Sequence, residues 1–470
     1  MENKLIHAAE RKAFEVAIDS LIKHVGDDPT NMVKIINIGE KFIGKSWSPE
    51  AYEKLKAAFS DENSKWAKFG RRLVEETDPF VLKQAFLTLG YEAGFHGYRI
   101  TQEMSEKYDC NIPWVILMDP TSACNMHCIG CWAAEYGNKY NLTYEDMDSI
   151  VTQGKELGIH AYLLTGGEPM VRKNDIIKLC EKHNDCMFSA FTNGTLIDED
   201  FCKEMLRVGN FMPSISIEGY AEENDGRRGA GHFEKAMHAM DLLKKHKLLF
   251  GTSICYTSKN YKTVTSDDFI DLLIEKGVKY TWYFHYMPVG NEASTDLLLT
   301  PEQREYMYHR VREIRGWEGG KELFAIDFQN DGEFVHGCVA GGRCYCHINP
   351  IGDVEPCVFI HYSSANIHDK SLIECLQQPI FKAYRQQQPF NENHLMPCPM
   401  LENPEKLQQI VHETGAVSTD LQSPESCEHL CGKCVQYAKD WKPVAQKPLE
   451  KNQNSKFIKE PIIIGSFLCK

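Results

Sequence analysis

Three cysteines lie within eight residues, in the sequence Cys-Asn-Met-His-Cys-Ile-Gly-Cys that runs from Cys124 through Cys128 to Cys131. Structural zinc commonly takes four protein ligands, often as two separated Cys-x-x-Cys pairs. A 4Fe–4S cube also takes four cysteines as a rule, so a trio without a fourth cysteine close by leaves one iron open. The spacing therefore predicts an iron–sulfur cluster whose open iron binds and reduces a substrate or cosubstrate.

A glycine-rich turn offers a second set of useful groups, at Gly166, Gly167, Glu168 and Pro169. Glycines adopt positive φ and expose their backbone groups, so a ligand can approach the chain closely. The carboxylate of Glu168 can complement an ammonium group. From the residues alone, the tetrapeptide is equally an ordinary turn.

The C-terminal third of the chain carries the other group of cysteines. In Cys338-x13-Gly352-x4-Cys357 a glycine turn between two expected strands brings two thiolates together, and Cys398 follows in a Met-Pro-Cys-Pro loop. Nine of the 18 cysteines fall between residues 326 and 440, and they include Cys344, Cys346, Cys375, Cys427, Cys431 and Cys434. A zinc knuckle is the alternative, because spacing alone does not choose the metal.

These motifs need elements to position them, and a regular alternation supplies them. Apolar, β-branched or aromatic segments alternate with amphipathic helical stretches, and the expected strands are 114–120, 161–165, 187–192, 214–218, 249–256 and 279–288. A capping box at Thr300, with proline in the first helical position, begins the last helix. Six strand–helix units predict a parallel sheet, closed or partly closed into a barrel, with the active site at the C-terminal strand ends.

A Cys-x3-Cys-x2-Cys loop after the first strand of such a barrel resembles the radical S-adenosylmethionine (radical SAM) superfamily. The resemblance implies that Cys124, Cys128 and Cys131 hold a 4Fe–4S cluster whose fourth iron chelates S-adenosylmethionine. One electron then cleaves the cosubstrate to methionine and a 5′-deoxyadenosyl radical, which abstracts hydrogen from a substrate. The residue before the third cysteine, often aromatic in the family, is Gly130 here, and Trp132 follows instead, which leaves the adenine contact unassigned.

The same resemblance implies further cosubstrate contacts. The Gly166–Pro169 turn after the second strand matches the family's motif for the methionine amino group. Asn193 after the third strand, Ser216 in the fourth, and Arg228 in the following loop match weaker family elements, with Arg227 as the alternative arginine. Turn or solvated roles are the competing interpretation of these three residues.

The C-terminal cysteines resemble the SPASM and twitch domains, which hold auxiliary iron–sulfur clusters. The resemblance implies Cys338, Cys357 and Cys398 as ligands of one auxiliary cluster. The standard pattern continues with Cys-x2-Cys, but Leu401 stands there, so the fourth ligand comes from Cys344, Cys346 or the later trio Cys427, Cys431 and Cys434. That trio completes the first auxiliary cluster or holds a second.

The expected fold class is α/β: a partial (β/α)6 TIM-like barrel, a helical N-terminal region, and a small cysteine-rich α+β domain. The expected domains are residues 1–110, 111–325 and 326–440, followed by a tail over 441–470 whose apolar end packs as an added strand or is loosely ordered. The N-terminal helices either pack on the barrel as a bundle or serve as a membrane-surface element or substrate lid.

Composition narrows the class of protein. A formal net charge of −14 argues against a nucleic-acid binder. The N-terminus lacks the pattern of a secretory signal, and the apolar segment 461–468 is too short to span a bilayer. Without an export signal, grouped cysteines indicate metal ligands in a reducing compartment, so we expect a cytoplasmic enzyme.

The sequence thus predicts a radical SAM enzyme that takes electrons from a donor such as flavodoxin or ferredoxin. No residue pattern selects the substrate, which the resemblance leaves as a peptide, a small molecule or a lipid. The alternative is a non-catalytic iron–sulfur or zinc protein, which would need neither a large barrel nor a cosubstrate turn.

Overall fold

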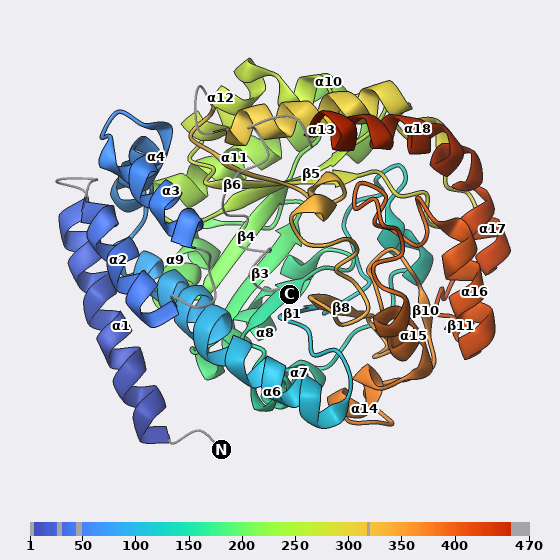
Figure 1. The fold of residues 1–470 in the computed structure, drawn as a ribbon, viewed down its shortest axis with the longest axis horizontal. Helices are drawn as coiled ribbons and strands as arrows, with labels where there is room; N and C mark the ends of the chain where they lie inside the picture. The colour runs from blue at the N-terminus through green and yellow to red at the C-terminus, as the bar shows by residue number, and fades with distance from the viewer. Residues whose placement is uncertain (1–3, 26–30, 44–48, 317–319, 453–470) are drawn as a thin grey trace.

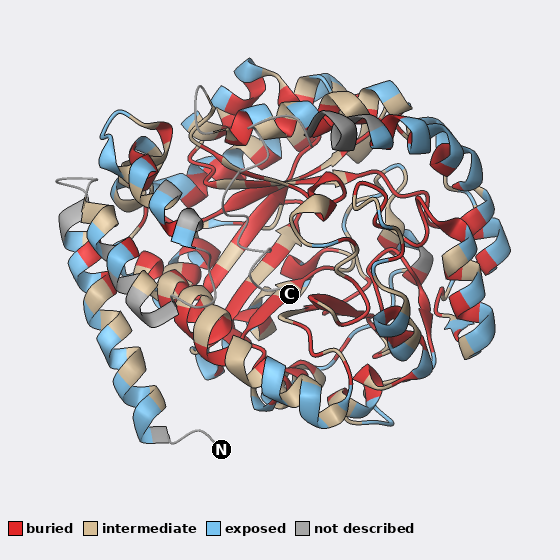
Figure 2. Ribbon diagram, in the orientation of Figure 1, coloured by how far each residue is buried: buried red, intermediate tan, exposed pale blue. Residues whose placement is uncertain are grey.

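The computed structural model describes residues 4–25, 31–43, 49–316 and 320–452, and Figure 1 shows their arrangement. A twisted sheet crosses the middle of the molecule, with the N-terminal helices on one side and the C-terminal segments on the other. The strands are largely buried, while the outer faces of the surrounding helices are exposed (Figure 2). This arrangement follows from the alternation of apolar strands with amphipathic helices.

The core of the sheet consists of parallel strands that follow one another in the chain. Each of the six predicted strands is present, and the elements in order are β1 (Val115–Met118), α7 (Tyr144–Glu156), β2 (Ala161–Leu164), α8 (Lys173–Lys182), β3 (Met187–Thr192), α9 (Glu199–Val208), β4 (Phe211–Ser216), α10 (Ala221–Arg228), α11 (His232–Lys245), β5 (Gly251–Tyr256), α12 (Asp267–Glu275), β6 (Tyr280–His285) and α13 (Pro301–Arg315). The predicted capping box at Thr300 begins α13, and a second one at Thr143 begins α7.

The sheet is larger than predicted and it stays open. Its order is β7-β6-β5-β4-β3-β2-β1-β8-β9, so β7 (Phe324–Asp327) and β9 (Val354–Glu355) form its edges among the described residues. The α/β class and the partial barrel are confirmed, with nine strands in place of six. β8 (Tyr345–Ile348) pairs in parallel with β1, and Val115 lies opposite Tyr345. Strand β7 spans the predicted boundary at residue 325, and the sheet continues beyond it.

The N-terminal helices pack on the end of the sheet as a bundle. They are α1 (Lys4–Val25), α2 (Asn31–Ile43), α3 (Pro49–Ser60), α4 (Lys65–Glu76), α5 (Pro79–Ala85), the π-helix η1 (Phe86–Gly97) and α6 (Tyr98–Tyr108). The guanidinium of Arg72 in α4 donates to the carbonyls of Ile274 and Val278 at 3.1 and 2.9 Å, which fixes this helix to the loop before β6. Among the described residues, no helix has the length and apolarity needed to cross a bilayer.

The C-terminal segment wraps around the edge of the sheet that β8 and β9 form next to β1 (Figure 1). It contains β10 (Tyr362–Ser363), α14 (Leu372–Leu376), α15 (Pro379–Gln387), α16 (Pro404–Thr414), β11 (Val417–Ser418), α17 (Cys427–Gly432) and α18 (Val435–Asn452). The predicted tail from residue 441 begins instead inside α18, where the buried Trp441 anchors the helix against α13. The apolar end at 461–468 lies outside the described residues.

Candidate functional site

The cysteine trio lies in the loop that leaves the C-terminal end of β1, where the sequence places it. Cys124, Cys128 and Cys131 are all partly exposed. Burial, helped by the charges of Glu168, Cys131 and Cys128, raises the pKa of Cys124 to about 11. Burial also raises the pKa of Cys128, which the nearby guanidinium of Arg228 lowers. Three mutually interacting thiols beside fixed positive charge suit an iron–sulfur cluster, whose net charge is negative when thiolates hold it.

Backbone hydrogen bonds join this loop to the glycine turn. Gly167 N donates to Thr121 O at 2.9 Å, and Glu168 N donates to Ala123 O at 2.8 Å. A Cβ on Gly167 would lie 2.3 Å from Ala123 O, which is closer than real Cβ contacts allow. Gly166 has φ +97°, a conformation that favours glycine. The glycines therefore allow the turn to pack on the cysteine loop itself, whereas the sequence suggested that they make room for a ligand.

The carboxylate of Glu168 is buried and already holds three neighbours. It accepts hydrogen bonds from Thr192 Oγ1 at 2.6 Å, from Asn193 N at 2.7 Å and from Met170 N at 2.9 Å. Burial raises its pKa. The side chain of Glu168 thus joins the turn after β2 to the end of β3. Pro169 is the first residue of the short helix η3 (Pro169–Arg172).

Asn193 joins the turn after β3 to the cysteine loop. Its Nδ2 donates to Asn125 Oδ1 at 2.8 Å, and Asn125 Nδ2 donates to Thr195 Oγ1 at 2.8 Å. Ser216 lies at the end of β4 and is 8% exposed. The structure therefore brings the predicted residues of β2, β3 and β4 to the same edge of the sheet as the cysteine loop.

The two candidate arginines converge on one buried carboxylate. Arg227 Nη1 lies 2.7 Å from Glu218 Oε1, and Arg228 reaches the same oxygen from Nη2 at 2.5 Å and from Nε at 3.0 Å. The other oxygen, Oε2, is buried without a hydrogen-bond partner among the described residues. Ile129 N donates to Arg227 O at 2.9 Å, so this arginine pair is also tied to the cysteine loop.

Two residues of the site were not assigned from the sequence. Cys255 on β5 is partly exposed, and its electrostatic neighbours include Arg227, Glu218 and Cys131. Tyr286 follows β6, and its buried hydroxyl has no hydrogen-bond partner in the described part of the chain. Both come from strands far along the chain, and the aromatic character of the sixth strand was the one available signal.

The contact between Tyr286 and Gly130 explains the departure from the family pattern. Gly130 has φ +65°, and a Cβ there would lie 2.7 Å from Tyr286 Cε2. An aromatic side chain before the third cysteine would collide with this ring. Tyr286, just after β6, therefore supplies an aromatic ring beside Gly130.

The auxiliary candidates Cys338, Cys357 and Cys398 influence one another electrostatically. Burial raises the pKa of Cys338 to about 11, that of Cys357 to about 12, and that of Cys398 well above its usual range. The predicted glycine turn is present, because Gly352 has φ +89° and connects β8 to the antiparallel β9. Tyr345 Oη lies 2.8 Å from Cys357 Sγ, while Met400 N and Leu401 N each donate to Cys398 Sγ at 3.4 Å.

A second group of thiols lies on α17 and at its end. Cys427, Cys431 and Cys434 are all buried, and Cys427 Sγ lies 3.8 Å from Cys431 Sγ. Cys398 is one of the groups that raise the pKa of Cys431, so the two auxiliary groups are neighbours. Cys346, considered as a substitute ligand, lies in β8 and has Cys375 as its thiol neighbour. Strand alternation explains this, because the adjacent Tyr345 faces Cys357.

Two regions of the chain match known family models. Residues 118–273 match the family model of the Radical SAM superfamily, and residues 338–400 match that of an iron–sulfur cluster-binding domain, SPASM. The AdoMet-dependent heme synthase of Methanosarcina barkeri is 24% identical over 69% of this chain and 89% of its own length. The mycofactocin maturase MftC of Mycolicibacterium smegmatis is 26% identical over 58% of this chain and 69% of its own.

Solved structures show the same fold. SuiB of Streptococcus suis, bound to its precursor peptide SuiA, superposes with a TM-score of 0.55 at 16% identity, over 75% of this chain and 81% of SuiB. The matched radical SAM region contains the cysteine trio, the glycine turn and the arginine pair, and the matched SPASM region contains Cys338, Cys357 and Cys398. The chain therefore contains a radical SAM domain followed by a SPASM iron–sulfur cluster-binding domain.

Proposed function

We propose that Cys124, Cys128 and Cys131 are the ligands of the radical SAM cluster, and that the surrounding turns hold the cosubstrate over it. The observation that carries this assignment is the bonding of the cysteine loop to three neighbouring segments, through Thr121 and Ala123 to the glycine turn, through Asn125 to the turn after β3, and through Ile129 to α10. A cluster held there supplies the electron that cleaves S-adenosylmethionine and so generates the hydrogen-abstracting radical.

The cosubstrate contacts follow from groups that point to the same edge. The Glu218 carboxylate binds both arginines through one oxygen, so the guanidinium groups keep further donors for an anion such as the methionine carboxylate. We assign Arg228 as the primary contact, because its charge lowers the pKa of the Cys128 thiol more than the charge of Arg227 does. Gly166, Gly167, Glu168, Pro169, Asn193 and Ser216 shape the turns around the cosubstrate.

The auxiliary thiols fit one or two further clusters. Cys338, Cys357 and Cys398 form one interacting group, and Cys427, Cys431 and Cys434 form another. Four of the six are buried, Cys338 and Cys398 are partly exposed, and N–H groups donate to Cys357 and Cys398. Buried thiolates that accept hydrogen bonds are typical ligands of redox-active clusters, whose potentials these bonds adjust. A zinc knuckle remains the alternative for these ligands.

A peptide is the substrate class that we propose first. Support comes from the SuiB structure, in which a precursor peptide is bound, and from the similarity to a mycofactocin maturase. A tetrapyrrole-like small molecule is the second candidate, supported by similarity to heme synthase. We propose in addition a reduced flavodoxin or ferredoxin as electron donor and a cytoplasmic location, because the cluster thiols must stay reduced.

The inner face of the sheet favours an uncharged or aromatic group at the reacting end of that substrate. Trp282 and Phe284 both lie on the partly exposed face of β6, and their rings stack with centroids 6.0 Å apart. Phe191 from β3 and Phe328 after β7 pack edge-on or tilted against Phe284, at 5.4 and 5.2 Å. An aromatic wall of this kind binds apolar or planar groups.

The test is reductive cleavage in anaerobically reconstituted protein. The native enzyme is expected to form 5′-deoxyadenosine from S-adenosylmethionine with dithionite or reduced flavodoxin, and the Cys124→Ala/Cys128→Ala/Cys131→Ala variant is expected to form none. Continued formation by the triple variant would refute the ligand assignment. Zinc in place of auxiliary iron in fully active protein would refute a redox role for the second group of cysteines.

A further inference from the structure

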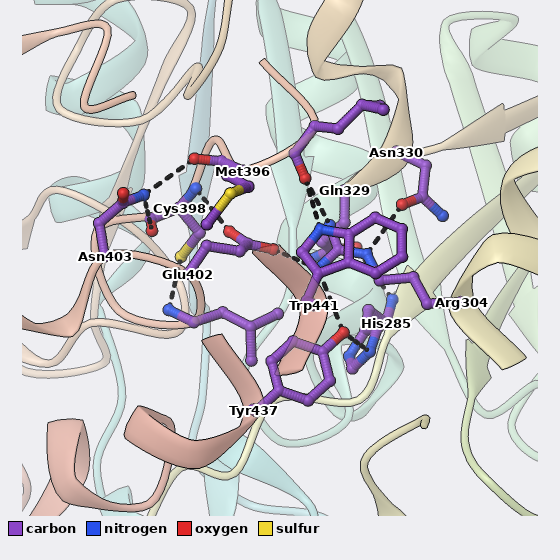
Figure 3. A network of polar contacts seen from close by, with 12 residues as sticks. His285, Arg304, Gln329, Asn330, Met396, Cys398, Glu402, Asn403, Tyr437 and Trp441 are labelled. Atoms are coloured by element: carbon purple, nitrogen blue, oxygen red, sulfur yellow. Dashed lines mark hydrogen bonds and ion pairs between the residues drawn. The ribbon is translucent and has the colours of Figure 1, made fainter. Parts of the chain in front are cut away.

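A buried ion pair joins the barrel to the loop that carries Cys398 (Figure 3). Arg304 in α13 and Glu402 are both fully buried, and Arg304 Nη1 lies 2.6 Å from Glu402 Oε1. Removing both charges from water is costly, and a well-packed apolar pair would often stabilise a protein as well or better. A fully buried ion pair at this position therefore indicates a function other than packing alone.

On one side, the pair fixes the backbone around Cys398. Glu402 Oε2 accepts a hydrogen bond from Cys398 N at 2.8 Å. The adjacent Asn403 Nδ2 donates to Cys398 O at 3.0 Å and to Met396 O at 2.8 Å. The peptide groups on both sides of the cysteine are thus held, while two further N–H groups point at its sulfur.

On the other side, the guanidinium of Arg304 is held from every direction. Nε donates to Asn330 Oδ1 at 3.0 Å, Nη2 to Leu395 O at 3.2 Å, and Nη1 also to Tyr437 Oη at 3.1 Å. The Trp441 ring lies 4.4 Å from the guanidinium carbon. Figure 3 shows Tyr437 and Trp441 of α18, and Asn330 after β7, around Arg304 of α13.

The network continues into the barrel. Tyr437 Oη lies 2.8 Å from His285 Nε2, at the end of β6. The next residue is Tyr286, whose ring packs on Gly130 beside Cys131. A continuous set of buried contacts therefore connects the auxiliary cysteine loop to the cysteine loop of the radical SAM core.

The negative charge of this network lies nearer to Cys398 than the positive charge does. The carboxylate of Glu402 contacts the backbone of Cys398 directly, at 2.8 Å, whereas the compensating Arg304 guanidinium binds the other oxygen of that carboxylate. A cluster bound at Cys398 gains negative charge when it is reduced. A fixed carboxylate close to it disfavours reduction, since the potential of a cluster depends on nearby charge and on hydrogen bonds to its sulfurs.

We propose that Arg304 and Glu402 are positioning residues for the auxiliary cluster, which hold Cys398 in its ligating geometry and set the reduction potential of that cluster. This inference rests on the proposed role of Cys398 as a ligand. Neither residue touches the substrate or the reacting atoms, so the effect of each reaches the reaction through the cluster.

The experiment uses the full chain with Cys124, Cys128 and Cys131 replaced by alanine, so that auxiliary iron alone is observed. Glu402→Gln keeps an oxygen that can accept from Cys398 N but removes the negative charge. We expect unchanged iron and sulfide content and a midpoint potential shifted to a more positive value, measured by redox titration followed by electron paramagnetic resonance.

Asp331→Asn is the matched control. Asp331, which follows β7, forms a buried ion pair at 2.7 and 2.8 Å with Arg315 of α13, the helix that also carries Arg304, and within the described residues no hydrogen bond joins Asp331 to a cysteine. This control should leave the auxiliary potential unchanged. An unshifted potential in Glu402→Gln, or an equal shift in both variants, would overturn the proposal.

A second pair of variants separates geometry from charge. Arg304→Lys keeps the positive charge but loses the fork of donors, so we expect little change in potential and faster loss of iron to a chelator. Glu402→Ala removes the acceptor of Cys398 N and should also lose iron faster, whereas chelation at the native rate in both would contradict the positioning role. If the parent protein binds no auxiliary iron at all, the ligand assignment itself fails.

Discussion

The two cysteine regions solve the same chemical problem in different ways. In the core loop, three partly exposed thiols come from one stretch of eight residues, and backbone bonds to neighbouring turns hold that stretch. In the SPASM region, the thiols come from segments up to about 100 residues apart, four of the six are buried while Cys338 and Cys398 are partly exposed, and side chains such as Glu402 and Tyr345 hold them. A site built from one short loop leaves its open side free for a cosubstrate to enter, whereas a site built from distant segments ties those segments together.

The sharpest way to break this comparison is to remove ligands from the core loop. Replacing any one of Cys124, Cys128 and Cys131 with alanine should abolish 5′-deoxyadenosine formation, because no other thiol in the loop can replace the lost ligand. The auxiliary iron should remain, at about four per chain for one cluster or eight for two. The cleavage assay measures the loss of 5′-deoxyadenosine formation, and iron analysis measures the iron that remains. Loss of all iron would show that the auxiliary region cannot bind its iron when the core loop lacks a ligand.

The same operation in the auxiliary region should have a structural effect as well. Cys338→Ala/Cys357→Ala should strip at least one cluster and lower the melting temperature, because metal binding is coupled to folding where the ligands come from separate segments. Thermal unfolding of the reconstituted double variant, beside the single core variants, measures the difference. Equal melting temperatures in the two sets would contradict a stabilising role for the auxiliary cluster.

Gly167→Val tests whether the glycine turn acts through the cysteine loop. A Cβ there meets Ala123 O at 2.3 Å, so the two loops must move apart, at a cost of about 1–3 kcal/mol. We expect weaker S-adenosylmethionine binding by calorimetry together with a perturbed core-cluster spectrum. Weaker binding with an unchanged spectrum would instead indicate that the glycine faces the ligand.

The smallest effect is expected at the contact between Gly130 and Tyr286. Gly130→Ala places a methyl group against the tyrosine ring and strains a residue at φ +65°, at a cost of roughly 1–2 kcal/mol. Tyr286→Ala should relieve part of this cost in the double variant. Urea unfolding of the two single variants and the double variant gives the coupling energy, and strict additivity would mean that the two residues do not interact.

How much of the molecule the sequence predicts depends on how local each feature is. The cysteine trio, the glycine turn and the capping box at Thr300 are short and contiguous, and all three occupy the places in the fold that their patterns indicate. The six core strands were predictable because each shows its own apolar run. The alternation extends to the helices that follow them.

Features assembled from distant segments were not predictable. The parallel pairing of β8 with β1, the convergence of Cys255 and Tyr286 on the core loop, and the pair of Arg304 with Glu402 each depend on the folded arrangement. The position of α18 was not predictable either. Its polar composition indicates a tail, but the buried Trp441 holds the helix against α13. No local pattern marks such partners, so tertiary packing decides them.

The pairing of β8 with β1 also has a consequence for how the enzyme is made. Strand β1 leaves the ribosome early, but its partner on one side is encoded roughly 230 residues later, which is about 10 to 50 seconds of synthesis at ordinary rates. Through that interval one edge of the nascent sheet offers unpaired N–H and C=O groups to any other chain nearby. Slow release of the C-terminal half, or its truncation before residue 345, should therefore direct the chain toward chaperones or aggregates rather than toward a separately folded barrel.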